Sequence, residues 1–205
     1  MTDAPTLFFD IGGVILTNGW DTAARKRAVG AFGLDPAEFQ TRHEMLKTAF
    51  ETGRLDIDTY IRRAVFHKER PFAADDFKAF MFEQSEPIEG GATLDFVRAL
   101  ADSGRYRIYA LNNESRALHE HRVERFQLGS IFRGFLTSCY LGQVKPDEEI
   151  YRNALGIAAC RRELALFIDD RELNVEPALA LGLHAIRYTG FDQIRTYLKG
   201  QGIEA

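Results

Sequence analysis

The sequence predicts an α/β fold, with a Rossmann-like parallel core of five strands and an inserted helical segment. Five short apolar runs do not alternate in polarity, which is typical of strands covered by helices on both faces. Helical patterns separate the later runs, and this alternation indicates right-handed crossovers and a parallel sheet. Residues from about 20 to 86 break the alternation, because their patterns are helical only. The predicted strands are Thr6–Phe9, Arg107–Leu111, Phe135–Ser138, Leu164–Ile168 and Leu183–Arg187.

The first predicted strand is an apolar run that ends at Asp10 and continues as Ile11-Gly12-Gly13-Val14. A carboxylate and two glycines therefore follow a buried strand, where the backbone is bare enough for a ligand to approach. Ligands of open α/β sheets bind at the carboxyl ends of strands, so Asp10 is a candidate site residue. Asn18-Gly19 is a strong tight-turn signal, which predicts a small hairpin leading into the helical segment.

The helical segment is predicted to contain four helices. Asp35-Pro36-Ala37-Glu38 combines an N-cap carboxylate, a proline at the first helical position and a glutamate at the third. Gly53 is expected to end that helix, and Asp56 to cap the next. The following residues place apolar side chains on one helical face, and a shorter helix precedes Pro87. These apolar residues are Ile57, Tyr60, Ile61, Ala64 and Val65, then Phe77, Phe80 and Met81.

Apolar stripes predict three further helices among the later parts of the chain. They are formed by Thr93, Leu94, Val97, Leu100 and Ala101, by Ile150, Ala154 and Leu155, and by Val175, Ala178, Leu179 and Leu181.

Length and composition exclude several classes of function. The 205 residues suit one large domain or one domain with an insertion, and the 45% apolar and 27% charged shares are ordinary for a soluble protein. A net charge of −4 without a basic cluster argues against a nucleic-acid partner. No apolar stretch reaches membrane-spanning length, and residues 1–5 lack a signal-peptide pattern. Cys139 and Cys160 are too few and too ill-spaced for a disulfide framework or metal motif, so we expect reduced thiols in a cytoplasmic protein.

Polar residues follow four of the predicted strands, directly or after a few residues. They are Asp10, Asn112-Asn113, Lys145-Pro146-Asp147 and Asp169-Asp170. Each alone has an ordinary explanation, such as a helix cap, a turn or a solvated surface lysine. Together they converge, because parallel strands bring their carboxyl ends to one edge of the sheet. Three carboxylates that lie close together repel one another and call for a cation, and Mg²⁺ suits carboxylates plus a phosphate. A lysine and an amide would hold the remaining phosphate oxygens.

The order of these motifs resembles the haloacid dehalogenase-like (HAD) hydrolase superfamily. The matching segments are FFDIGGVIL (8–16), YALNNESR (109–116), GQVKPDEEIY (142–151) and LFIDDRELNVEPALALG (166–182). The resemblance covers the whole chain and implies a core domain of residues 1–17 and 87–205 with a helical cap domain at 18–86. The chain looks most like the phosphatase branch whose first motif reads Asp-x-Gly-Asn-Val, which is associated with sugar 1-phosphates.

The resemblance implies a Mg²⁺-dependent hydrolase of a small phosphorylated metabolite, with neither nucleic acid nor membrane as partner, and either a monomer or a homodimer. Asp10 would be the nucleophile and would form an aspartyl-phosphate. The metal would be held by the carboxylates of Asp10 and Asp170 and the backbone carbonyl of Gly12. Asp169 would ligate it through water or orient Lys145. Lys145 would neutralise charge on Asp10 and on the transferred phosphoryl group.

Three further residues are implied in phosphate binding. Asn112 stands where the family usually has Ser or Thr and would donate a hydrogen bond to a phosphate oxygen. The backbone N–H groups of Ile11 and Asn113 would complete the phosphate cradle.

One departure from the family keeps two alternatives open. Most phosphatases of this superfamily have a second Asp as general acid and base where this chain has Gly12, and losing such a group costs roughly a hundredfold to ten-thousandfold in rate. Glu114 could serve instead, although a surface glutamate is the commoner situation. The alternatives are a metal-independent 2-haloacid dehalogenase and a non-catalytic protein that binds a phosphometabolite or a partner. Gly12 and the Asp169-Asp170 pair argue against the first, and retention of the nucleophile argues against the second.

Four residues of the helical segment could face a substrate: Trp20, Arg42, His43 and Arg54. Arg54 is the best of them, because it lies in a Thr-Gly-Arg loop between two helices. For each of these residues, packing or a solvated face is the commoner role.

Overall fold

A computed structural model describes residues 4–205, so the first three residues of the expected core segment 1–17 lie outside it. Its centre is a five-stranded parallel sheet in the order β3-β2-β1-β4-β5. The α/β class and the parallel sheet are therefore confirmed, and each strand lies within a residue or so of its predicted bounds. The strands are β1 (Thr6–Phe9), β2 (Arg107–Asn112), β3 (Phe135–Thr137), β4 (Ala165–Asp169) and β5 (His184–Arg187).

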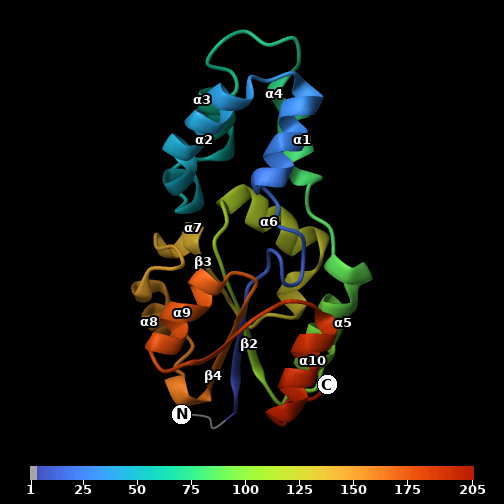
Figure 1. Ribbon diagram of the computed structural model, residues 1–205, viewed down its shortest axis with the longest axis vertical. Coiled ribbons are helices and arrows are strands. Elements are labelled where there is room, and N and C mark those ends of the chain that lie inside the picture. The colour runs from blue at the N-terminus through green and yellow to red at the C-terminus, as the bar shows by residue number, and fades with distance from the viewer. Residues whose placement is uncertain (1–3) are drawn as a thin grey trace.

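Helices cover both faces of the sheet, as the non-alternating strands require (Figure 1). Alternate residues of β1 point to opposite faces, so Leu7 and Phe9 pack in one hydrophobic cluster and Phe8 in another. The first cluster includes residues of α5 (Ala92–Asp102) and α10 (Phe191–Gly200), and the second includes residues of α8 (Glu148–Ile157) and α9 (Glu172–Ala180). The other helices that lie outside the predicted four-helix segment are α6 (Arg116–Arg125), α7 (Ser138–Leu141), η1 (Ile88–Gly91), η2 (Leu128–Ser130) and η3 (Arg162–Leu164).

The segment between β1 and β2 contains the four predicted helices, which stand beyond one end of the sheet (Figure 1). Asp21, Asp35 and Asp56 cap three of them, each accepting a backbone N–H hydrogen bond of 2.7 Å. Their apolar faces meet in a separate cluster that contains Trp20, Phe39, Tyr60 and Phe77. α2 ends at Glu51, and Gly53 follows its C-cap residue Thr52 with φ +71°, the left-handed conformation in which a glycine ends a helix. The helices are α1 (Thr22–Phe32), α2 (Pro36–Glu51), α3 (Ile57–Ala64) and α4 (Ala74–Phe82).

The chain enters and leaves this helical unit through two segments that pair with each other. Thr17 donates its backbone N–H to the Glu86 carbonyl at 2.7 Å and its hydroxyl to the Gln84 carbonyl at 3.0 Å. Arg122 of α6 donates to both of these segments, to the Ser85 hydroxyl at 2.8 Å and to the Thr17 carbonyl. The boundaries at residues 18 and 86 remain a prediction, which this pairing supports.

The predicted hairpin at Asn18-Gly19 is wrong. Gly19 and Trp20 do form a turn, as their signal predicts, but no strands pair across it. Another turn lies earlier, where Ile15 and Leu16 both donate to the Ile11 carbonyl at 3.0 and 2.9 Å. Leu16 then pairs with Pro87 rather than with residues that follow Gly19. No returning strand forms after Gly19, because Asp21 caps α1 immediately beyond it.

None of the helices within residues 4–205 is both long and apolar enough to cross a membrane.

Candidate active site

Asp10 lies immediately beyond β1, at the carboxyl edge of the sheet. Its backbone N–H continues the sheet ladder by donating to the Ile168 carbonyl at 2.9 Å. Asp10 is 7% exposed, and its Oδ1 accepts the Ile11 N–H at 2.8 Å. The strand therefore fixes the backbone of Asp10, while the side chain still reaches a cavity at the sheet edge.

Lys145 lies between two carboxylates. Its Nζ is 3.1 Å from Asp10 Oδ1 and 2.6 Å from Asp169 Oδ2, and it also donates to the Leu111 carbonyl at 2.9 Å. The Lys145 side chain is buried, so it is not the solvated surface lysine that the residue alone would suggest. Burial disfavours the ammonium, but Asp10 and Asp169 outweigh it, so the pKa of Lys145 is raised. Lys145 is therefore a buried cation that neutralises both acids.

The loop that carries Lys145 is fixed to the end of β2 by Asn113. The Asn113 amide donates to the Lys145 carbonyl at 2.8 Å and accepts the Lys145 N–H at 2.9 Å. This reciprocal pair explains why Lys145 is well placed although it lies beyond the end of β3.

Asp10, Asp169 and Asp170 form an acidic cluster whose ligand atoms lie within 4.8 Å of one another. Asp169 is held by the Arg171 N–H and the Asn174 amide, both at 2.9 Å. Burial, the largest cause, and the neighbouring carboxylates together raise the pKa of Asp10 to about 7, against the opposing effect of Lys145. Among residues 4–205, Lys145 is the cation that pairs with this cluster, and the oxygen donors of the three carboxylates suit a hard divalent cation.

Asp170 supplies direct support for a cation at this cluster. Its Oδ2 accepts a hydrogen bond from the Asn18 amide at 3.3 Å. Its Oδ1 is buried and has no hydrogen-bond partner within residues 4–205. A buried carboxylate oxygen is costly when unpaired, so a metal ion would fit this position.

The two glycines after Asp10 make room for this arrangement. Gly13 has φ +76°, and a Cβ there would lie 2.3 Å from Asp170 Oδ2. A Cβ at Gly12 would lie 2.7 Å from Asn18 Oδ1. The space in which the second aspartate of related motifs would begin is therefore occupied by the Asn18 amide.

The residues expected to bind phosphate differ in their surroundings. Asn113 lines the cavity, whereas Asn112 is 1% exposed and is not among the lining residues. The Asn112 amide oxygen accepts the Thr137 hydroxyl at 2.9 Å. The Ile11 N–H is already used by Asp10 Oδ1. The structure therefore brings these residues to one sheet edge, and their roles toward phosphate remain predictions.

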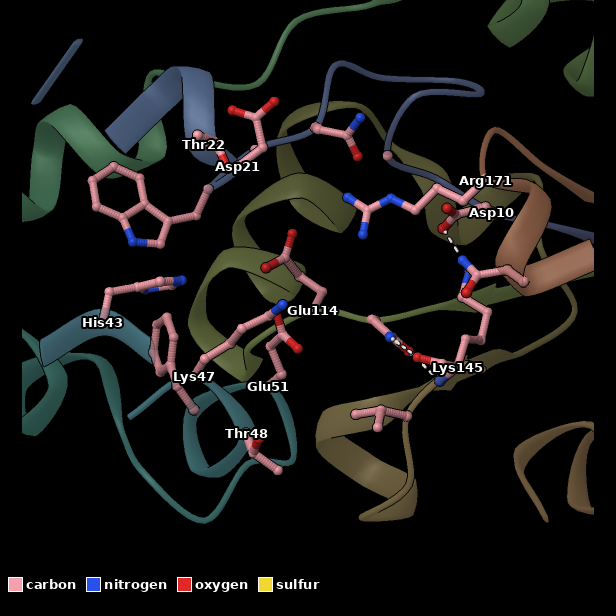
Figure 2. Close-up of a pocket in the computed structure, with 18 of the residues that line it drawn as sticks. Asp10, Asp21, Thr22, His43, Lys47, Thr48, Glu51, Glu114, Lys145 and Arg171 are labelled. Atoms are coloured by element: carbon pink, nitrogen blue, oxygen red, sulfur yellow. Dashed lines mark hydrogen bonds and ion pairs between the residues drawn. The ribbon is translucent and has the colours of Figure 1, made fainter. Parts of the chain in front are cut away.

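A cavity of about 670 Å³ connects the acidic cluster with the helical unit (Figure 2). Asp10 and Lys145 lie on one side of it, and side chains of α2 project from the opposite side. The volume is within the range of small-molecule sites, roughly 300–1,000 Å³. Asp10, Gly12, Asn113 and Lys145 line it together with Trp20, Arg25, His43, Glu44, Lys47, Glu51, Glu114 and Arg171.

The structure corrects the expected substrate-facing residues of the helical unit. Trp20 and His43 line the cavity, but Arg42 and Arg54 do not, and Arg54 is exposed with its Nε on the Thr52 hydroxyl. Sequence reasoning missed Lys47 and Glu51. The signal was available in their spacing, because residues four apart share a helix face and 43, 47 and 51 form one stripe.

Glu114 is buried rather than a surface glutamate. Its Oε2 accepts from the Arg122 guanidinium at 2.9 Å, and Oε1 accepts the Ser115 N–H at 3.0 Å. Burial raises the pKa of Glu114, and the Arg122 charge opposes that shift. Both carboxylate oxygens are therefore engaged at the crossing between the helical unit and the sheet, which does not favour Glu114 as a general base.

Comparisons with known proteins agree with this architecture. Residues 4–182 match the family model described as a haloacid dehalogenase-like hydrolase. The chain is 24% identical over 200 residues to the chloroplastic flavin mononucleotide hydrolase 1 of Arabidopsis thaliana, covering 97% of this chain and 78% of that protein.

Solved structures of the HAD family enzyme bt-2542 from Bacteroides thetaiotaomicron share the fold. Its magnesium complex has a TM-score of 0.78 at 20% identity, covering 96% of this chain and 99% of that one. Its complex with magnesium and inorganic phosphate has a TM-score of 0.75 at 20% identity, covering 92% and 96%.

Proposed function

The chain belongs to the haloacid dehalogenase-like hydrolase family and is an enzyme, and we propose that it is a Mg²⁺-dependent phosphomonoesterase that acts on a small phosphorylated metabolite. The helical unit α1–α4 would serve as the cap over the cavity, excluding water and contacting the leaving group. The observation that carries the proposal is Lys145 Nζ, 3.1 Å from Asp10 Oδ1 and 2.6 Å from Asp169 Oδ2 beside the third carboxylate.

The residues present fit a magnesium ion. Asp10 and Asp170 would hold it together with the Gly12 carbonyl, and Asp170 Oδ1, which has no hydrogen-bond partner among the described residues, is a suitable ligand atom. Asp169, whose Oδ2 is already taken by Lys145, would orient that lysine rather than ligate directly. When bound, Mg²⁺ would offset the negative charge of the phosphate and of the carboxylates.

Asp10 would act as the nucleophile. An oxygen of its carboxylate forms a bond to phosphorus, and the bond from phosphorus to the leaving-group oxygen breaks. Lys145 would stabilise the charge of the phosphoryl group during this transfer, because its ammonium already faces Asp10. Water then attacks phosphorus, releases inorganic phosphate and regenerates Asp10.

Gly12 supplies no proton to the leaving group and no base to the attacking water. We therefore expect good leaving groups to be preferred and the aspartyl-phosphate to hydrolyse slowly.

The names of related proteins support the substrate class. The Arabidopsis thaliana relative is a flavin mononucleotide hydrolase, and a flavin mononucleotide is a phosphomonoester. The bt-2542 enzyme was solved with magnesium and inorganic phosphate. A small phosphate ester and Mg²⁺ are therefore the natural first choices for assay.

The direct test is phosphate release from an aryl phosphate with Mg²⁺ and after chelation by EDTA. We expect turnover that requires Mg²⁺ and returns when the metal is restored. Halide release from a 2-haloacid in EDTA would instead identify the metal-independent dehalogenase. Tight phosphometabolite binding without any release of phosphate would identify a non-catalytic binder.

Magnesium is expected to stabilise the folded protein. Protons compete with the metal for carboxylates, and the pKa of Asp10 near 7 keeps that group largely protonated in acid. The pKa of an aspartate carboxyl is ordinarily 3.8, and that of Asp10 in the folded protein is about 7. Between these values the unfolded chain releases the Asp10 proton and the folded protein keeps it, so the metal-free protein loses stability as pH rises from about 4 to 7. The Tm gain from Mg²⁺ over EDTA should therefore be larger at pH 8 than at pH 5.5.

Asp170→Asn is the matched variant for this measurement, because it removes the ligand charge while keeping the side-chain shape. It should lose most of the Mg²⁺-dependent Tm gain at pH 8. An equal gain in wild type and variant would place the metal elsewhere.

Restoring an acid at position 12 should raise activity only when room is made for it. Gly12→Asp alone would bring its Cβ against Asn18 Oδ1, so we expect no gain. Gly12→Asp combined with Asn18→Ala should raise kcat toward alkyl phosphates by up to about a hundredfold, because poor leaving groups benefit most from a proton donor. Asn18→Ala alone is the control. Equal rates in Asn18→Ala and in the double variant would show that the missing acid does not limit the rate.

A further inference from the structure

A buried chain of three hydrogen-bonding side chains ends at the wall of the cavity. The Trp20 Nε1–H donates to the Tyr60 hydroxyl at 2.8 Å, and that hydroxyl lies 2.9 Å from His43 Nδ1. The three residues are 8%, 0% and 3% exposed, so water does not compete for these contacts. They join the start of α1, α3 and α2 inside the helical unit.

The direction of these hydrogen bonds follows from the chemistry of the groups. Indole only donates, so the Tyr60 oxygen accepts from Trp20. Within residues 4–205 the Tyr60 hydroxyl has no acceptor other than His43, so its own hydrogen is directed to His43 Nδ1. Burial, then the charges of Arg25 and Lys47, lowers the pKa of His43 to about 3. The ring is therefore neutral and carries its single proton on Nε2.

That Nε2–H has no partner among the described residues. The atom is buried, and His43 lines the cavity. Figure 2 shows the His43 ring directed into the cavity from the side opposite Asp10 and Lys145. A fixed donor without an acceptor is unfavourable in the free protein, and an acceptor on a bound molecule would remove that cost.

Lys47 lies one turn further along the same face of α2 and also lines the cavity. Its ammonium has neither a hydrogen bond nor an ion pair within the part of the chain that the structure describes. Glu44 and Glu51 line the same wall and offset the charge of Lys47, which acts on the Glu51 carboxyl, so the wall as a whole does not call for a second anionic group on the ligand. This wall therefore favours a neutral group that is rich in hydrogen-bond acceptors.

We propose that His43 is a specificity-determining residue that donates from Nε2 to a neutral acceptor, a carbonyl or hydroxyl oxygen or a ring nitrogen, on the leaving group of the substrate. Tyr60 is the positioning residue that holds the required tautomer, and Lys47 is the second donor. The inference rests on the proposed phosphomonoesterase function for its placement of the phosphate at Asp10.

The tautomer is tested first, by long-range ¹H–¹⁵N NMR of the histidine rings at pH 7. The wild type should show His43 protonated at Nε2, and Tyr60→Phe should show a population protonated at Nδ1. Wild-type His43 protonated at Nδ1 would overturn the proposal. This signature is specific to tautomer control, since simple loosening of the helical unit would not exchange the proton between the two nitrogens.

Selectivity is tested by kinetics with flavin mononucleotide and glucose 1-phosphate, whose leaving groups are rich in acceptors, and with phenyl phosphate, which has none beyond the phosphate. His43→Leu should reduce kcat/KM for the better of the two metabolites about tenfold more than for phenyl phosphate. His43→Gln, which keeps an N–H near the Nε2 position, should recover most of that selectivity. Equal losses on all substrates would contradict the proposal.

His184→Leu is the matched control, because His184 is exposed on β5 and is not among the residues lining the cavity. It should leave all the rates unchanged.

A binding measurement that needs no turnover distinguishes failure of the proposed phosphatase function from failure of the role proposed for His43. Riboflavin and glucose are the leaving groups alone, and the better of them should bind His43→Leu about tenfold more weakly than wild type and His43→Gln. If the wild type hydrolyses no phosphate ester yet shows this pattern, the function fails and the role of His43 stands. Binding of neither compound, or equal binding to all variants, would overturn the role of His43.

Discussion

Asp10→Asn should reduce phosphate release from an aryl phosphate in the presence of Mg²⁺ by roughly ten-thousandfold or more. An amide cannot form the acyl phosphate, and loss of a covalent nucleophile typically removes most of the catalytic advantage. The fold should persist, because the Asp10 backbone bond to the Ile168 carbonyl does not involve the side chain. Steady-state rates at saturating substrate measure the effect on kcat.

The control for that loss is a carboxylate that lies outside the cavity. Asp102 is exposed at the end of α5, so Asp102→Asn should keep the wild-type rate. Wild-type turnover in Asp10→Asn would show that Asp10 is not the nucleophile.

Lys145→Met should abolish turnover and also destabilise the fold by about 3–5 kcal/mol. The substitution keeps the length of the side chain but leaves Asp10 and Asp169 buried without their shared cation. The Asp10 carboxyl would then retain its proton to higher pH, because the lysine that lowers its pKa is gone. Urea unfolding in EDTA at pH 7 measures the free energy of unfolding without a contribution from the metal.

A second variant separates stability from catalysis. Lys145→Met combined with Asp169→Asn removes one of the two buried carboxylates that lack a counter-ion, so the double variant should regain about half of the lost stability. It should remain inactive, because no ammonium faces the phosphoryl group. Recovery of activity in the double variant would show that Lys145 acts only as a structural counter-ion.

Much of the sheet and its acidic edge could be predicted from sequence because the relevant signals are local. Five buried apolar runs predict the strands, and the chain direction of a parallel sheet alone brings Asp10 and Asp169-Asp170 to one edge. The helix starts at Asp35 and Asp56 also depend on neighbouring residues, and both form the predicted cap contacts.

What could not be predicted depends on contacts between distant segments. Lys145 is buried because Asn113 fixes its loop, and Glu114 because Arg122 reaches it from α6. No hairpin forms at Asn18-Gly19, because Asp21 caps α1 immediately beyond it. The sequence points to Arg54 in its loop and not to Lys47, because it does not show which face of α2 is turned toward the cavity.

The central claim, that Asp10 carries the phosphoryl group, is tested most directly by trapping the intermediate. Gly12 leaves its hydrolysis without a base, so the aspartyl-phosphate should accumulate during turnover of an aryl phosphate with Mg²⁺. Borohydride reduces acyl phosphates to alcohols, and peptide mass spectrometry should therefore find homoserine in place of Asp10. Steady phosphate release with Asp10 unmodified, or with the modification at another residue, would contradict the account.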